Sequence, residues 1–344
     1  MADDAAKAPL VVVLGASGYI GSAVVAQFAR RPVRLRLVGR EAPHPLPDAP
    51  AWTETCAADL TRPDEARRAV AGADVVLHLV ARLGAGLAWR VAEEDPVAAE
   101  VNMGAMRNVL SALSAEPRAT GEPPPVVVFA GSAAQSGVAG RVSGGEPDRP
   151  VTVYARQKLA AEHLLKEAVA RGTVRGVSVR LPTVYGAAPG SLGKGVVTAM
   201  AACALDGKPL TVWREGAGER DLLHVTDAAR ALVLAADRAN VLSGHHWLAG
   251  TGRPVAVAEL FALIAAAVAA RTGQPPVPVR EVAPPASATL ADARGMDVDS
   301  SAFRAATRWR PRARLVPSLD ALVAAMVRRR GPGAGTQRMC TPGT

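Results

Sequence analysis

Short, continuously apolar runs alternate with longer amphipathic segments through the first half of the chain. The apolar runs, which we predict to be strands, lie at 11–14, 35–38, 75–80, 126–130 and 176–181. The amphipathic segments, which we predict to be helices, lie at 21–30, 63–70, 92–114 and 152–171. Continuously apolar strands separated by amphipathic helices are typical of a parallel sheet with both faces covered. The pattern therefore predicts an α/β fold with a doubly wound parallel sheet.

The regular alternation ends near Gly186, and the rest of the chain has its own turns and helix-like stretches at 195–206 and 256–271. We expect this smaller C-terminal region to cover the carboxyl edge of the sheet, where ligands of such folds bind. The first domain is predicted to comprise 9–186 and about 222–250, and the second about 187–221 and 251–325. Residues 1–8 and 330–344 are predicted to be disordered ends.

Composition narrows the class of protein. The chain has 344 residues, of which 49% are hydrophobic, enough for a full globular core. It shows no recognisable targeting segment and no long charge-free apolar run of membrane type, so we expect a cytoplasmic protein that does not bind membranes. The three cysteines, Cys56, Cys203 and Cys340, lack metal-ligand spacing, so neither a disulfide framework nor a metal site is expected.

The net charge of +9 raises the possibility of a nucleic-acid partner. However, the arginines are spread along the whole chain and aromatic residues make up only 3% of it. No basic stripe with interleaved stacking side chains is visible, so we expect no nucleic-acid binding. Part of the positive charge suits an anionic small-molecule substrate.

A glycine turn lies between the first predicted strand and the first predicted helix. Its sequence is Gly15-Ala-Ser-Gly-Tyr-Ile-Gly21, with glycines at the first, fourth and seventh positions. Glycines at such a turn allow backbone amides to approach a pyrophosphate, which the helix N-terminus also attracts. The spacing alone is a weak signal, but its place between strand and helix predicts a dinucleotide site.

Tyr154 and Lys158 are four residues apart in the predicted helix at 152–171. Residues at this spacing share one helix face. A nearby cation stabilises a phenolate, so we expect Lys158 to lower the pKa of Tyr154 and make it an efficient proton donor. An isolated pair of this kind is common by chance, and the glycine turn is what makes it informative.

With these motifs assembled, the chain resembles the extended short-chain dehydrogenase/reductases, the nucleotide-sugar epimerase and dehydratase family, over about residues 10–325. The resemblance also rests on Asp59-Leu60, 76–81, Asn102, Ser132, 180–186, 220–227 and 250–254. Stretches such as Leu-Gly-Ala-Ser-Gly-Tyr-Ile-Gly-Ser and Arg-Asp-Leu-Leu-His-Val are similar to the dTDP-4-keto-6-deoxy-L-hexose 4-ketoreductases of bacterial antibiotic deoxysugar pathways. The resemblance implies a Rossmann-type fold, a homodimer and NADPH-dependent reduction of a C4 ketone.

The resemblance implies three catalytic residues. Ser132 would hydrogen-bond the C4 oxygen, Tyr154 would donate the proton, and Lys158 would act on Tyr154 while contacting the nicotinamide ribose. Hydride transfer to a ketone develops negative charge on its oxygen, and donors of this kind meet that need.

The cofactor site is implied by the same family pattern. Arg40 follows the second strand, where an arginine favours the phosphate of NADPH, although Glu41 could compete as an acidic reader of NAD. The implied cofactor contacts are Gly15, Ser17, Gly18, Tyr19, Ile20, Gly21, Arg40, Asp59, Leu60, Leu79, Val80, Ala81, Asn102, Tyr154, Lys158, Leu181, Thr183 and Val184.

The substrate contacts implied by the family are Ser132, Ala133, Thr183, Lys194, Val196 and Arg220. Arg220 stands where the family usually has a cation for the substrate diphosphate. Thr183 replaces the family's usual asparagine. For His224 and Asp227 we expect a structural role, and for His78 a hydrogen-bonded position in the core or at the sheet edge.

Two other functions remain open. Dehydratases of this family carry an acid pair directly after the catalytic serine or threonine, where this chain has Ala133-Ala134, but a 4-epimerase with tightly bound NAD needs no such pair. A non-catalytic protein that senses NADP or binds a partner is a remote third possibility.

Overall fold

The computed structural model describes residues 8–43, 51–83, 95–137, 139–193, 195–214, 218–284 and 295–330. Its main element is a seven-stranded sheet in the order β12-β7-β5-β4-β1-β2-β3, in which every pairing is parallel. The strands are β1 (Leu10–Leu14), β2 (Arg34–Gly39), β3 (Trp52–Ala57), β4 (Val75–His78), β5 (Val126–Ser132), β7 (Arg175–Leu181) and β12 (His246–Leu248). The predicted doubly wound α/β fold is confirmed.

The five predicted strands form the centre of this sheet as β1, β2, β4, β5 and β7. The strand predicted at 75–80 ends two residues earlier than predicted, at His78. The two outer strands were not predicted. β3 is a largely exposed edge strand without an apolar run, and β12 has only three residues.

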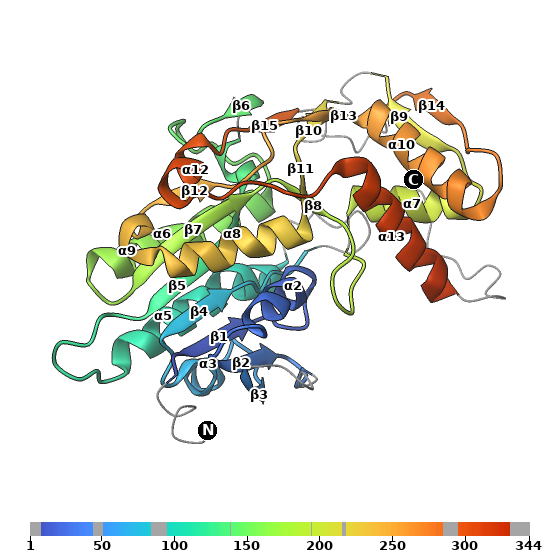
Figure 1. Cartoon of the computed structure of the whole chain (residues 1–344). Helices are drawn as coiled ribbons and strands as arrows, with labels where there is room; N and C mark the ends of the chain where they lie inside the picture. Colours follow the sequence, from blue (N-terminus) through green and yellow to red (C-terminus); the bar gives the residue numbers. More distant parts are fainter. Residues whose placement is uncertain are drawn as a thin grey trace.

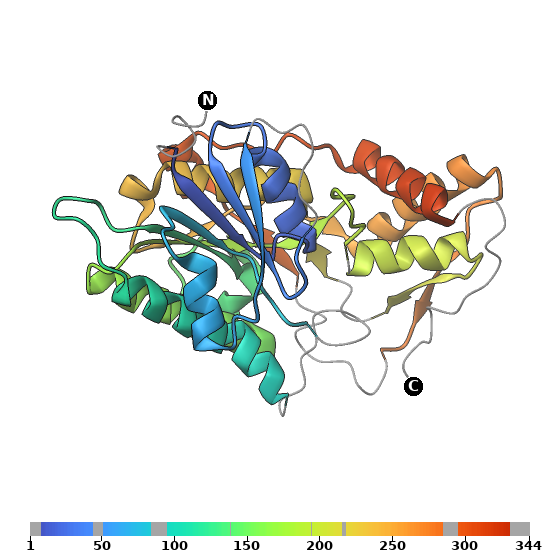
Figure 2. The same cartoon turned by 90° about the horizontal axis from the view of Figure 1, so that it is seen from below.

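Helices cover both faces of the sheet (Figures 1 and 2). One face packs against α3 (Pro63–Val70), α5 (Ala105–Ala115) and α6 (Val153–Ala170). The other face packs against α2 (Tyr19–Phe28) and α8 (Val225–Asp237), and a short helix, α9 (Ala239–Leu242), follows. The described part of the helix predicted at 92–114 consists of α4 (Pro96–Ala99), the π-helix η1 (Glu100–Gly104) and α5. We did not predict α8.

A second core lies beside the carboxyl edge of the main sheet, on the right in Figure 1. It is built from α7 (Val196–Leu205), α10 (Val257–Thr272), α13 (Leu315–Arg330) and the parallel pair β9 (Leu210–Trp213) and β14 (Val279–Val282). The predicted helices at 195–206 and 256–271 are confirmed as α7 and α10. The division into a cofactor domain and a substrate domain stays a prediction.

Two small sheets join the two cores. One has the order β13-β10-β15-β6 and the other pairs β11 with β8. The strands are β13 (Val255–Ala256), β10 (Glu219–Arg220), β15 (Met296–Val298), β6 (Gly140–Val142), β11 (Leu222–His224) and β8 (Thr183–Tyr185), and the short helices η2 (Ala133–Ser136) and α12 (Ser301–Thr307) complete the fold. Of the predicted disordered ends, 1–7 and 331–344 lie outside the described residues. Two residues assigned to these ends are ordered: Arg330 is helical, and the carbonyl oxygen of Ala8 accepts from Nε of Arg34 at 2.9 Å.

The described helices were searched for membrane spans, and none of them is long and apolar enough to be one.

Candidate active site

The glycine turn joins β1 to α2 in a compact arrangement. Gly15 has a φ of 84°, and its amide donates to the carbonyl oxygen of Val38 at 2.9 Å. A Cβ on Gly21 would lie 1.9 Å from the carbonyl oxygen of Gly15, so a side chain there would push α2 away from the turn. Gly18 is exposed at the start of α2, as is Ser17. This backbone cradle at a helix N-terminus fits the pyrophosphate of a dinucleotide.

Tyr19 and Ile20 open α2, and both side chains pack on the core. The Tyr19 hydroxyl donates to the carbonyl oxygen of Gly186 at 2.8 Å, and burial raises the pKa of this phenol. A Cβ on Gly193 would lie 2.7 Å from the Tyr19 ring. The Tyr19 side chain therefore ties the glycine turn to the segment that follows β8.

Arg40 and Asp59 lie near each other beyond the carboxyl ends of β2 and β3. Asp59 accepts hydrogen bonds from the amide and hydroxyl of Thr61, which hold its pKa below the usual range with a smaller contribution from the charge of Arg40. Arg40 and Glu41 are exposed, whereas Leu60 belongs to the core under α3 and α5. An exposed cation beside an acceptor is the arrangement expected for reading an adenosine ribose.

Asn102 is buried in the π-helix η1. Its side-chain oxygen accepts from the amide of Arg82 at 2.8 Å, and its nitrogen donates to the Arg82 carbonyl and to Gln157 at 3.0 and 2.7 Å. The predicted cofactor residues Leu79, Val80 and Ala81 directly precede Arg82. Asn102 therefore holds this loop against α6, and π-helical turns of this kind are frequent at functional sites.

Ser132 lies at the end of β5, and Tyr154 and Lys158 lie in the first two turns of α6. Ser132 is the last residue of β5, and its register partner on β7 is Leu181. Lys158 is buried, donates from Nζ to the carbonyl oxygen of Ala130 at 2.9 Å and lies 5.9 Å from the centre of the Tyr154 ring. Burial lowers the pKa of Lys158 to about 7.

The expected lowering of the Tyr154 pKa is wrong for this structure. Burial raises the pKa of the phenol instead, because loss of solvent disfavours the charged phenolate. Tyr154 therefore keeps its proton through the physiological range, as a donor must.

His78 is fully buried, as expected, but the expectation that it is hydrogen-bonded is wrong. Within the described ranges, neither ring nitrogen has a hydrogen-bond partner. The ring packs edge-on against Phe129, with 5.8 Å between centroids. Burial, with the charge of Lys158, lowers the pKa of His78 to about 3, so the residue is neutral.

The predicted substrate residues lie on several elements. Thr183 and Val184 are in β8, and Thr183 pairs with Leu222 of β11, two residues beyond Arg220. Arg220 is half-buried in β10, and Val196 begins α7. Ala133 is buried at the start of η2. Lys194 lies outside the described residues.

His224 and Asp227 have contacts that fix the local chain. His224 caps α8 through Thr226, while Asp227 accepts from Arg230 and from the amides of Arg312 and Ala313. Burial lowers the pKa of His224.

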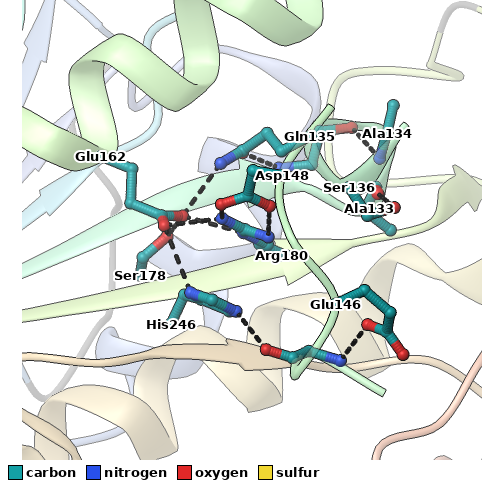
Figure 3. A network of polar contacts seen from close by, with 12 residues as sticks. Ala133, Ala134, Gln135, Ser136, Glu146, Asp148, Glu162, Ser178, Arg180 and His246 are labelled. Atoms are coloured by element: carbon teal, nitrogen blue, oxygen red, sulfur yellow. Dashed lines mark hydrogen bonds and ion pairs between the residues drawn. The ribbon is translucent and has the colours of Figure 1, made fainter. Parts of the chain in front are cut away.

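A buried polar network close to Ser132 and Lys158 was not predicted (Figure 3). Its centre is Glu162, which is fully buried on α6 one turn after Lys158. Arg180 binds it with two hydrogen bonds of 2.8 and 3.0 Å and also forms a bidentate pair with Asp148 at 2.6 and 2.7 Å. The sequence signal was an arginine inside an apolar strand, because such a charge needs a buried partner.

Several contacts together keep Glu162 ionised. Burial opposes the charge, but contacts with His246, Arg180 and Lys166 outweigh it and hold the pKa well below the usual range. Lys166 donates to Glu162 at 2.8 Å, and Nδ1 of His246 lies 3.4 Å from the same carboxylate.

Comparison with known proteins agrees with this geometry. Residues 11–250 match the model of the NAD dependent epimerase/dehydratase family. The chain is 29% identical over 238 residues to a dTDP-6-deoxy-L-talose 4-dehydrogenase (NAD(P)(+)) of Kitasatospora kifunensis, which covers 66% of this chain and 69% of that relative.

Solved structures have the same fold. MoeE5 in complex with UDP-glucose and NAD is 26% identical and superimposes with a TM-score of 0.74 over 93% of this chain and 99% of that one. The UDP-glucose 4-epimerase of Thermotoga maritima, at 21% identity, has the same fold with a TM-score of 0.74 over 93% and 99%. The cradle for a dinucleotide, the Ser132, Tyr154 and Lys158 group and these matches lead to one conclusion: the chain belongs to the NAD dependent epimerase/dehydratase family, the extended short-chain dehydrogenase/reductases that modify nucleotide sugars.

Proposed function

We propose that this enzyme reduces the C4 ketone of a dTDP-4-keto-6-deoxyhexose with NADPH, as in antibiotic deoxysugar biosynthesis. The observation that supports the proposal is the hydrogen bond of 2.9 Å from Lys158, one turn after Tyr154 on α6, to the carbonyl oxygen of Ala130, two residues before Ser132 at the end of β5. The relative from Kitasatospora is named for the dehydrogenation of a dTDP-6-deoxyhexose at C4 with NAD(P)+. Reduction of the 4-keto sugar is the reverse of that reaction.

The chain supplies donors for the reacting oxygen. Ser132 Oγ accepts from the amide of Ala134 at 3.3 Å, and this leaves its hydroxyl hydrogen available for the C4 oxygen. Tyr154 transfers its proton to the same oxygen as negative charge develops there. The ammonium of Lys158 stabilises the phenolate that remains. A bound nicotinamide supplies the hydride, so ketone and NADPH plus the proton give alcohol and NADP+.

The residues after Ser132 favour simple redox chemistry over elimination. Ala133 and Ala134 have no groups that exchange protons, and η2 is closed by a capping box between Ser132 and Gln135. We therefore propose no dehydratase activity.

The second candidate is a nucleotide-sugar 4-epimerase with tightly bound NAD. It is favoured by the fold shared with MoeE5, whose structure holds UDP-glucose and NAD. Against it stands Arg40, an exposed cation after the end of β2, where an arginine would favour the extra phosphate of NADPH. A non-catalytic sensor is the remote third candidate. Such a protein would not require Ser132, Tyr154 and Lys158, and this chain has all three.

The test is loss of NADPH absorbance with an enzymatically prepared dTDP-4-keto-6-deoxy-L-hexose. Tyr154→Phe is expected to lower turnover by about 10²-fold or more while NADPH still binds, since it removes the proton donor alone. Unchanged turnover in Tyr154→Phe would refute the mechanism. NAD released from the denatured wild-type protein, with no oxidation of NADPH, would favour the epimerase.

We also propose a homodimer through helices within 92–114 and 152–171, as the family resemblance implies. A molar mass from light scattering equal to one chain would refute this.

A further inference from the structure

A row of side chains runs across one face of the main sheet beneath α6. The strand register places Phe129 of β5, Ser178 of β7 and His246 of β12 side by side. Phe129 belongs to the core on the α6 face, so its neighbours in the row share that face.

Helix α6 covers this row with a charged side chain at each successive turn. Lys158 lies over the Phe129 ring, with Nζ 4.5 Å from its centroid. One turn later Glu162 accepts from the hydroxyl of Ser178 at 2.7 Å. The next turn brings Lys166 to 3.1 Å from Nδ1 of His246. The helix that carries Tyr154 and Lys158 is thus fixed to the sheet by a polar seam.

The seam continues to the third catalytic residue. Gln135 donates from Nε2 to Glu162 at 2.9 Å, and its Oε1 accepts from the backbone amide of Ser132 at 2.7 Å. Gln135 and Glu162 are both fully buried, and Figure 3 shows the Gln135 side chain directed at the Glu162 carboxylate. Ser132 on β5 and the catalytic face of α6 are therefore joined by two consecutive hydrogen bonds through a single amide side chain.

We propose that Gln135 and Glu162 are positioning residues that set the distance from Ser132 to Tyr154 and Lys158; this rests on the catalytic role proposed for those three residues. The amide of Gln135 offers a donor to the carboxylate and an acceptor to the backbone amide at the same time. The buried carboxylate is held by Arg180, so it forms a fixed anchor. A misplacement of about 1 Å in such a group is enough to lower turnover by ~10²-fold.

The test compares two variants that each remove one hydrogen bond to the same oxygen of Glu162. Gln135→Met breaks the link to Ser132, whereas Ser178→Ala removes a bond of similar length and leaves that link intact. Gln135→Met is expected to lower kcat by about 10 to 100-fold with little change in KM, and Ser178→Ala by less than about threefold. Equal losses of kcat in the two variants would overturn the proposal.

A double-mutant cycle tests whether Gln135→Met lowers kcat through Ser132. In a Ser132→Ala background, Gln135→Met is expected to lower kcat no further, because its effect passes through Ser132. Full additivity would overturn the proposal.

Gln135→Glu adds a pH signature. A protonated glutamic acid can replace the amide, and the adjacent Glu162 carboxylate favours that protonated form. Turnover of Gln135→Glu relative to wild type is expected to rise as the pH falls. A ratio independent of pH would contradict the assignment.

Hydrogen exchange at the Ser132 amide separates this proposal from the proposed function, because it needs no substrate. Protection is expected to be lost in Gln135→Met and kept in Ser178→Ala. If the wild type reduced no keto sugar, the proposed reaction would fail, and the exchange result would still decide whether Gln135 holds Ser132. Protection that persists in Gln135→Met would overturn the link itself.

Discussion

Lys158 donates a hydrogen bond of 2.9 Å to the carbonyl oxygen of Ala130, two residues before Ser132 on β5. The bond directs the ammonium toward the end of the strand, but a carbonyl carries no charge to balance it. Burial therefore governs the ionisation of Lys158, and its pKa falls to about 7. The ammonium of Lys158 is held in place at a cost to the stability of the folded chain.

Lys158→Met is accordingly expected to stabilise the protein without cofactor. The folded state binds the proton of Lys158 less tightly than the unfolded chain, so the cost is fully present below about pH 7 and disappears as the pH rises toward 10.5. The gain in free energy of unfolding should be on the order of a few kcal/mol near pH 6 and less than half of that near pH 9.5. Urea unfolding at the two pH values measures it, and an equal gain at both would contradict this account.

His78→Leu should protect the protein from acid. The folded pKa of His78 is about 3 against 6.5 for the free side chain, so stability is lost as the pH falls below 6.5. Relative to wild type, we expect the free energy of unfolding of the variant to increase by about 2 kcal/mol more at pH 5 than at pH 8. His163→Leu, at an exposed position of α6, is the control and should show no such difference. Thermal or urea unfolding of both variants tests the prediction.

The sequence predicted the parts of the site that depend on local spacing. Tyr154 and Lys158 are one helical turn apart, and the glycine turn follows a continuously apolar strand, so both motifs are visible along the chain. Glu162 stands one further turn along the same face, but its role depends on contacts with Gln135 and Arg180 that the strand register creates. Such contacts leave no periodic signal.

The same limit explains the missed strands. β3 lies at the edge of the sheet with most of its side chains exposed, and β12 is only three residues long. Neither has the apolar run that marks a buried parallel strand. The positions of β3 and β12 are determined by their pairing with β2 and β7, and these contacts between distant segments leave no local pattern in the sequence.

Arg40→Ser is expected to change the coenzyme preference. If the guanidinium binds the 2′-phosphate, its loss removes charge-assisted hydrogen bonds and should raise KM for NADPH by about 10 to 100-fold, with KM for NADH within about twofold of wild type. Arg62→Ser is the control, because Arg62 is another exposed cation near Asp59. Initial rates with both coenzymes provide the measurement. Parallel changes for NADPH and NADH would show that Arg40 does not read the phosphate.

Glu162→Gln and Glu167→Gln form a matched pair on α6. Glu162 is fully buried and binds Arg180, whereas Glu167 is exposed and lies 3.9 Å from Arg171. Removal of one partner from a buried pair leaves an uncompensated charge. Glu162→Gln should therefore lower the free energy of unfolding by about 3 to 5 kcal/mol. Removal of the exposed acid should change stability by less than about 1 kcal/mol. Urea unfolding at pH 7 compares the two variants.

The pH dependence of the stability difference between wild type and Glu162→Gln distinguishes the contribution of the Glu162 charge from that of its hydrogen-bond geometry. Because its folded pKa lies well below 4.5, its ionisation stabilises the fold above that pH, and this contribution is lost as the pH falls. The difference in stability between wild type and Glu162→Gln should therefore narrow below pH 4.5. A difference that stays constant down to pH 3 would mean that hydrogen-bond geometry, and not the carboxylate charge, anchors α6 to the sheet.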